Sequence, residues 1–247
     1  MIILELRCGW KSASRVFAED GGWSVTTLDI LPKFRPDILA DITEWDFESY
    51  FENHPVPDVI WASPPCRTFT VQAWGKYRDS NGGASNIAGQ KGGACVRACL
   101  GCISFCLRKN PKLSYFVENP MHGAFRHLPC VVPFIRTGKY RRLQYGDYAP
   151  GTNSLKSTLV LTNCDTWVPR QMLLVRSKRP WNTLSKKQRT VIPRAVGEEV
   201  LAAVAARMCG GRVTRTSGGL KSLRTSLGKI ATFSGTKKKG VGTDESI

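Results

Sequence analysis

The sequence offers one cysteine in an unusual position for chemistry, Cys66, which directly follows Pro64 and Pro65. A thiolate is a nucleophile and a metal ligand, although many cysteines are only small buried side chains. Residues 58–62 are apolar, β-branched and aromatic, which predicts a buried strand. The two prolines lack an N–H and therefore end that strand. We expect Cys66 at the carboxyl end of a strand, where open α/β folds place their chemistry.

A carboxylate follows a second apolar run and gives the thiol a possible partner. Residues 113–116 predict a strand, and Glu118 comes just after it, within the sequence Val-Glu-Asn-Pro. A carboxyl group can hold or donate a proton while a thiolate attacks carbon. Taken singly, Cys66 could be a buried hydrophobe and Glu118 a solvated turn residue. Both groups follow strands, which favours a catalytic pair.

The elements that position this pair alternate along the chain. Strands are predicted at 2–6, 23–28, 36–42, 58–62, 113–116 and 157–163, and helices at 13–20 and 44–53. This alternation is typical of parallel βαβ units and predicts an α/β fold. We expect one domain over residues 1–209 and a basic, disordered tail over 210–247, where large apolar residues are few.

Composition narrows the class of protein. The 247 residues carry a formal net charge of +17, which favours polyanionic partners, nucleic acid first among them. No secretion signal or membrane-length apolar run is seen, so we expect an intracellular protein without a membrane partner. Nine cysteines without a secretion signal predict reduced thiols.

The order of the motifs resembles that of the DNA (cytosine-5) methyltransferases, which depend on S-adenosylmethionine. Pro64-Pro65-Cys66 matches the catalytic loop of this family, and Glu118-Asn119 matches its second catalytic motif. Residues 5–9 resemble the first cofactor motif, and residues 192–196 resemble the last motif. The similarity covers roughly residues 2–208.

This resemblance implies a Rossmann-like, S-adenosylmethionine-dependent methyltransferase fold with a mostly parallel central sheet. It further implies transfer of a methyl group to carbon 5 of cytosine in DNA, duplex or single-stranded. Cys66 would add to carbon 6, Glu118 would hold or protonate N3, and Arg142 would supply an arginine near the base. The target base must be flipped out or already unpaired. Expected cofactor-binding residues are Glu5, Gly9, Asp29, Ile30, Asp41, Ile42 and Pro64.

Asp29 has an independent argument as a ligand contact. It ends the second predicted strand, 20 residues after Gly9, where an acid can accept hydrogen bonds from both ribose hydroxyls of an adenosine ligand. A turn acid or helix cap is the alternative.

The sequence departs from the family pattern in four places. Lys11 stands where the family has a second glycine, which predicts a different path for the cofactor loop. Arg67 replaces the usual glutamine after the catalytic cysteine. The family's Arg-x-Arg is not reproduced around Arg142. Residues 164–187 are short for a recognition domain and form at most a minimal recognition segment.

Two other segments could contact the substrate. Residues 71–94 are basic, aromatic and glycine-rich, so they could form a closing loop in which Trp74 or Tyr77 stacks on a base, or a mobile surface loop. Residues 170–189 are basic and include Trp181, which suits either phosphate contacts or a solvated connector. The tail at 210–247 could add salt-sensitive affinity for DNA.

Three further cysteines, Cys95, Cys99 and Cys102, have the spacing of an iron–sulfur motif, and Cys106 is an additional thiol. Cys95, Cys99, Cys102 and Cys106 also follow one helical face among apolar neighbours, so we interpret them as part of a buried helix rather than a metal site.

Two functions other than DNA methylation remain open. A nearly absent recognition domain is compatible with a methyltransferase acting on RNA or free cytosine nucleotides. Lys11 and the missing Arg-x-Arg are compatible with a catalytically inactive nucleic-acid-binding relative.

Overall fold

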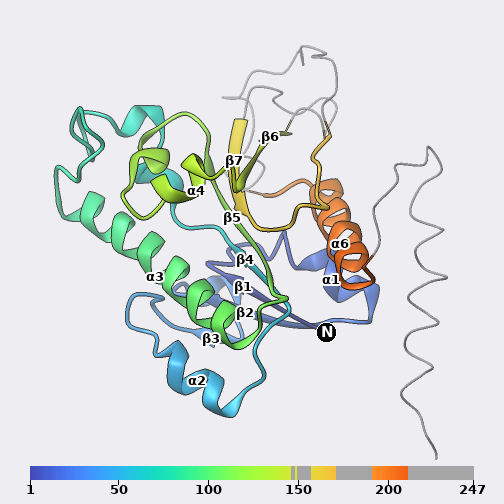
Figure 1. Cartoon of the computed structure of the whole chain (residues 1–247). Coiled ribbons are helices and arrows are strands. Elements are labelled where there is room, and N and C mark those ends of the chain that lie inside the picture. Colours follow the sequence, from blue (N-terminus) through green and yellow to red (C-terminus); the bar gives the residue numbers. More distant parts are fainter. Residues whose placement is uncertain (146–147, 149–156, 171–190, 211–247) are drawn as a thin grey trace, which may run out of the picture.

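A seven-stranded sheet forms the centre of the computed structural model, which describes residues 1–145, 148, 157–170 and 191–210 (Figure 1). The strand order across the sheet is β3-β2-β1-β4-β5-β7-β6. The strands are β1 (Ile2–Leu6), β2 (Ser24–Asp29), β3 (Ile38–Leu39), β4 (Val59–Ala62), β5 (Ser114–Pro120), β6 (Tyr140–Gln144) and β7 (Ser157–Thr162).

The pairing confirms a mixed α/β fold with a mostly parallel sheet. Strands β1 to β5 pair in parallel, and β7 is antiparallel to both β5 and β6. Each predicted strand is present, although β3 has only two residues where the sequence predicted a unit over 36–42. The carboxyl ends of β1, β4 and β5 therefore lie side by side at one edge of the sheet.

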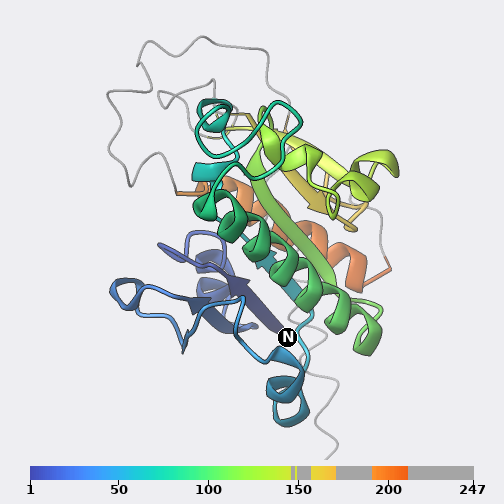
Figure 2. The ribbon, with the colours of Figure 1, turned by 90° about the vertical axis from the view of Figure 1, so that its left-hand side faces the viewer.

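Helices cover both faces of this sheet (Figures 1 and 2). Helices α1 (Arg15–Asp20) and α6 (Arg194–Met208) pack on one face, and α2 (Phe47–Asn53), α3 (Ile87–Lys109) and α4 (Val132–Arg136) pack on the other. Neighbouring strand residues such as Ile3 and Leu4 are buried in the two different cores. Two covered faces explain why the strands are continuously apolar. None of the described helices is long and apolar enough to cross a membrane.

The cysteine-rich stretch is a buried helix, as the spacing predicted. Cys95, Cys99, Cys102 and Cys106 all lie in α3 and are buried against the sheet. The described residues contain no group of side chains arranged to hold a metal ion.

The first turns of α3 correct the expectation of a loop over residues 71–94. Residues 87–94 are helical, and Asn86 caps the helix by accepting a hydrogen bond from Gly89 N. Glycines have low helix propensity, so this stretch looks like a loop in the sequence. In the structure these glycines allow close contacts: a Cβ at Gly89 would overlap the Tyr77 carbonyl, and one at Gly92 would overlap the Thr68 hydroxyl.

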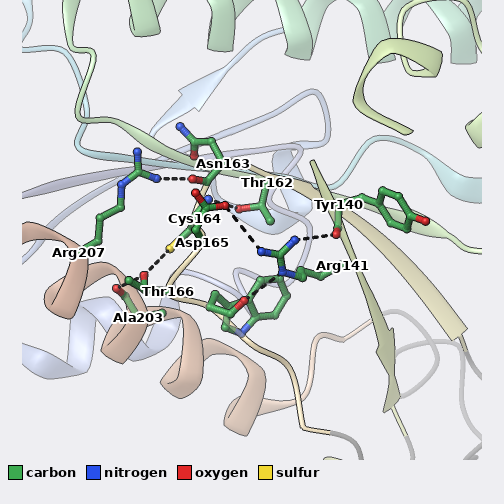
Figure 3. Close-up of polar contacts among 10 residues, drawn as sticks. Tyr140, Arg141, Thr162, Asn163, Cys164, Asp165, Thr166, Ala203 and Arg207 are labelled. Atoms are coloured by element: carbon green, nitrogen blue, oxygen red, sulfur yellow. Dashed lines mark hydrogen bonds and ion pairs between the residues drawn. The ribbon is translucent and has the colours of Figure 1, made fainter. Parts of the chain in front are cut away.

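The segment after β7 packs on the body of the protein and not away from it (Figure 3). Arg207 of α6 donates to the Asn163 carbonyl at 2.6 Å, and Thr166 donates to the Ala203 carbonyl at 2.8 Å. Trp167 is buried against Phe116 of β5, with 5.5 Å between ring centres. Cys164 and Trp167 are therefore buried, whereas Asp165 and Val168 are exposed, and the expected recognition segment remains a prediction. Residues 171–187, Trp181 and the tail after residue 210 lie outside the described part.

Candidate active site

The exposed thiol of Cys66 lies at the carboxyl edge of the sheet, in a 3-10 turn (Cys66–Thr68) that follows β4. The Cys66 carbonyl accepts hydrogen bonds from Phe69 N at 2.9 Å and Thr70 N at 3.2 Å. Asn119 on β5 donates its Nδ2 to the Pro64 carbonyl at 3.0 Å. The turn that presents the thiol is thus fastened to the strand that carries Glu118.

Glu118 is buried and bonded to two hydroxyl groups. Its Oε1 accepts from Thr158 Oγ1 at 2.9 Å and from Tyr145 OH at 3.3 Å. Burial first, and then the charges of Glu118 and of a Cys66 thiolate, raise the pKa of Tyr145 well above its ordinary value. Glu118 thus contacts the Tyr145 phenol directly, and the turn that carries Cys66 is fastened to the same strand through Asn119.

The pairing of the strands does not place Arg142 on the same face of the sheet as Glu118. On β5 and β7, Glu118 pairs with Val160, whereas Asn119 pairs with Leu159 and through it with Arg142 on β6. Paired positions share a face, so Arg142 starts from the face opposite Glu118. Its exposed side chain donates to the Ser157 hydroxyl at 3.1 Å. Its predicted role near the base remains a prediction.

The loop after β1 is organised around Glu5, which is 1% exposed. Its carboxylate accepts from Ser14 N at 3.1 Å, from Ala13 N at 3.4 Å and from the Ser14 hydroxyl. Burial outweighs these bonds and raises the pKa of Glu5 to about 7. Glu5 therefore holds the start of α1, and its predicted contact with a cofactor remains a prediction.

Asp29 fixes the glycine of the same loop. Its Oδ2 accepts from Gly9 N and its Oδ1 from Leu31 N, both at 3.0 Å. A carboxylate can accept about four hydrogen bonds, so acceptor capacity remains. Gly9 has φ 50°, and a Cβ there would meet open space. The two residues that were linked by spacing are in direct contact.

Lys11 adopts a backbone conformation that glycine favours. Its φ is 52°, and its Nζ donates to the Arg35 carbonyl at 2.6 Å. The sequence predicted a different path because a side chain disfavours positive φ. The lysine is accommodated in the left-handed region, with a bond at the end of its side chain.

The remaining predicted cofactor residues divide into exposed and buried groups. Ile30 is exposed beside Asp29, whereas the Ile42 side chain lies in the core and Pro64 is buried. Asp41 accepts from the Thr43 backbone N–H and hydroxyl, and the backbone bond is the main cause of its lowered pKa. Ile30 is the side chain of this set that is open for an apolar contact.

The C-terminal motif closes against the loop after β1. Ile192 N donates to the Ser12 hydroxyl at 3.1 Å, across 180 residues of sequence. Arg194 at the start of α6 forms an ion pair with Glu19 of α1 at 2.6 Å. The residues before and at the start of α6 therefore hold the loop after β1 and helix α1 in place.

Sequence reasoning missed the two hydroxyl partners of Glu118. Thr158 lies in a predicted strand, and alternation along that strand places it on the same face as Val160, which pairs with Glu118. Tyr145 directly follows β6, and the sequence motif of that strand pointed to its basic residues instead. Strand pairing, which the sequence does not reveal, was needed to find both.

Comparison with known proteins gives one informative match. No protein-family model matches the chain. The chain is similar to a protein of Frog virus 3 (isolate Goorha) named "Probable DNA (cytosine-5)-methyltransferase", with 31% identity over 134 residues. The match covers 51% of this chain and 56% of the viral protein, so the chain spans just over half the length of that relative.

Proposed function

We propose that this protein has a Rossmann-like methyltransferase fold and transfers a methyl group from S-adenosylmethionine to carbon 5 of cytosine in DNA through a covalent Cys66 adduct. The observation that carries the proposal is the attachment of the Cys66 turn to β5, the strand of Glu118, through the bond from Asn119 Nδ2 to the Pro64 carbonyl. Similarity to the viral protein supports a methyltransferase role, and its printed name suggests DNA as the substrate.

The residues at the edge of β1 and β2 fit the proposed cofactor. Asp29 keeps acceptor capacity for ribose hydroxyls, and the space beside Gly9 is open for close approach of a ligand. Ile30 and Trp10 expose apolar surface nearby, with Trp10 49% exposed and in edge contact with Phe34. These side chains would hold an adenosine group. Bound S-adenosylmethionine supplies an electrophilic methyl group.

Cys66 and Glu118 would divide the chemistry on the base. The Cys66 thiolate adds to carbon 6, and the displaced electron pair moves toward N3, which Glu118 protonates or holds by a hydrogen bond. Carbon 5 thereby becomes nucleophilic enough to take the methyl group. N3 then returns its proton to Glu118, carbon 5 loses its proton to a base, and the electrons of that bond restore the double bond and expel the thiolate.

Tyr145 and Thr158 would keep Glu118 in place during these steps. Both hydroxyls donate to the same carboxylate oxygen, Oε1, and so fix the orientation of the carboxylate. The high pKa of Tyr145 keeps its phenol protonated, so it stays a donor. A base inside a duplex cannot reach this pair, so the target cytosine must be flipped out or unpaired.

To test the proposal, the protein is incubated with labelled S-adenosylmethionine and, in separate reactions, with duplex DNA, single-stranded DNA, RNA or dCTP. We expect label in DNA from the wild type and none from Cys66→Ala. Cys209→Ala is the matched control, because Cys209 is the other exposed thiol among the described residues and lies just beyond α6. DNA containing 5-fluorocytosine should form a covalent complex with wild type and Cys209→Ala, since the blocked proton loss prevents release.

Other outcomes select the alternatives. Label in RNA or dCTP but not in DNA would assign the protein to a different cytosine substrate. DNA binding without transfer to any substrate would make it an inactive binding relative. Equal transfer by Cys66→Ala and wild type would rule out the covalent route.

A further inference from the structure

Arg78 is a buried arginine in the segment between the Cys66 turn and α3. It is 2% exposed, and among the ion pairs of the described residues none includes it. Its Nε donates to the Thr68 carbonyl at 3.1 Å, and its Nη2 donates to the Gly89 carbonyl at 2.8 Å. Burying a guanidinium is costly unless its donors are used, so these two bonds are its main compensation.

The two carbonyls belong to different elements. Thr68 ends the turn that begins at Cys66, and Gly89 lies in the first turn of α3. The Arg78 guanidinium also lies over the Phe69 ring, 4.4 Å from its centre. One planar side chain thus joins the thiol-bearing turn to the helix that covers this face of the sheet.

Two side chains bind backbone carbonyls of the turn, one before Cys66 in the sequence and one after it. Asn119 binds the Pro64 carbonyl two residues before Cys66, and Arg78 binds the Thr68 carbonyl two residues after it. The thiol itself remains exposed between these two attachments. The backbone that carries the thiol is therefore held on both sides.

Close packing leaves the turn little room to move. A Cβ at Gly92 would overlap the Thr68 hydroxyl, and one at Gly123 would overlap the Phe69 carbonyl. Ala124 N donates to that same Phe69 carbonyl at 2.9 Å. A shift of the turn would therefore require movement of α3 or of residues 123–124.

We propose that Arg78 is a positioning residue that fixes Cys66 by tying the Thr68 carbonyl to the start of α3. This inference rests on the methyl transfer proposed above. A lysine has one compact charge and cannot reproduce the two-pronged geometry of arginine, so only arginine holds both carbonyls at once.

The experiment compares Arg78→Met and Arg78→Lys with the wild type. Arg108→Met is the matched control, because its guanidinium also lies over a phenylalanine, Phe105, but is exposed at the far end of α3. We expect Arg78→Met to lower kcat for DNA methylation on the order of 100-fold, as misplacement of a reacting group does. KM for DNA should change less than about threefold, Arg78→Lys should be intermediate, and Arg108→Met should match the wild type.

Two further readouts separate positioning from general destabilisation. Amide exchange at Phe69 and Thr70 should rise about tenfold or more in Arg78→Met, because their bonds to the Cys66 carbonyl open more often, while exchange in the middle of α3 stays unchanged. In Arg78→Ala, added guanidinium ion should restore part of kcat by occupying the vacated site. If Arg78→Met does not fold, Arg78→Lys and the rescue of Arg78→Ala decide the question.

The inference is overturned if exchange at Phe69 and Thr70 matches the wild type, or if kcat falls only in proportion to the unfolded fraction. The proposed function fails separately, through absence of methyl transfer by the wild type. In that case amide exchange alone still decides whether Arg78 fixes the turn.

Discussion

The loop after β1 and the loop after β4 lie side by side at one sheet edge, but opposite kinds of group hold them. Carboxylates hold the first loop: Glu5 and Asp29 accept hydrogen bonds from its backbone N–H groups. Donors hold the second loop: Asn119 and Arg78 give hydrogen bonds to its backbone carbonyls.

This difference has a consequence for their response to pH. A buried carboxylate changes its charge within the accessible pH range when its pKa is raised, whereas an amide and a guanidinium do not. The first loop should therefore depend on pH, and the second should not. Substitutions in the two loops test that contrast.

The largest effect is expected from Asn119→Asp, which replaces the donor to the Pro64 carbonyl by an acid. A buried, uncompensated carboxylate costs about 3–5 kcal/mol, so the unfolding free energy at pH 8 should fall by that amount. The burial raises the pKa of the introduced group, so stability should recover as the pH is lowered and the acid becomes a donor again. Urea unfolding at pH 5 and pH 8 measures both.

Asn119→Leu is the control for this change, with an expected loss of about 1–2 kcal/mol that is the same at both pH values. If Asn119→Asp were equally stable at pH 5 and pH 8, the donor role of Asn119 would be refuted.

Glu5 should make the wild type less stable as the pH rises from 4.5 to 7. Burial raises the pKa of Glu5 to about 7 from an ordinary value of 4.5. Between these values the folded protein binds more protons than the unfolded chain, so folding free energy is lost with rising pH, up to about 3 kcal/mol. Glu5→Gln cannot ionise and should lack this loss, and the difference between the two urea-unfolding curves isolates it.

The exposed Glu52→Gln serves as the comparison for Glu5, and its curve should follow the wild type. The assignment would be contradicted if the unfolding free energy of the wild type minus that of Glu5→Gln rose or stayed constant from pH 4.5 to pH 7.

Gly92→Ala should disturb the second loop through contact rather than charge. The new methyl group would overlap the buried Thr68 hydroxyl, and such overpacking costs about 2 kcal/mol. Gly101→Ala is made in the same helix, where the nearest atom, on Phe47, is 3.8 Å away, so helix propensity should instead add up to about 1 kcal/mol. Thermal unfolding of both variants checks the opposite signs, and equal effects would argue against the close approach.

The smallest effect concerns Lys11 in the first loop. Lys11→Gly and Lys11→Ala both lose the bond to the Arg35 carbonyl, but only alanine keeps the strain of φ 52°. Lys11→Gly should therefore be more stable than Lys11→Ala by about 1 kcal/mol in urea unfolding. The reverse order would show that the positive φ carries no cost.

Much of the fold follows from local sequence patterns. The apolar run that ends at Pro64 and Pro65 predicted β4, and Gly21, at φ 78°, ends α1 where a helix stop was predicted. The one-sided spacing of cysteines from Cys95 to Cys106 identified the buried part of α3. These features depend on neighbouring residues, so the sequence displays them directly.

The rest depends on contacts between distant segments. The first turns of α3 resemble a loop in the sequence because they contain glycines. Gly89 and Gly92 are needed there because residues 77 and 68 pack directly against them, which the sequence does not reveal. Arg142 lies on β6, and Tyr145 directly follows that strand. Only the pairing of β6 with β7 tells which of the two side chains is on the face of Glu118. Residue type alone favoured the arginine.

The hydrogen bond between Ile192 and Ser12 can form only late in the synthesis of the chain. Ser12 belongs to the first loop of the chain, and Ile192 lies two residues before the start of α6, the last described helix. Synthesis runs from the N-terminus, so β1 and its loop leave the ribosome long before the segment that completes them. During that interval the face of the sheet that α6 will cover, with Trp61 and Phe116 on it, is open to chaperones and to other nascent chains.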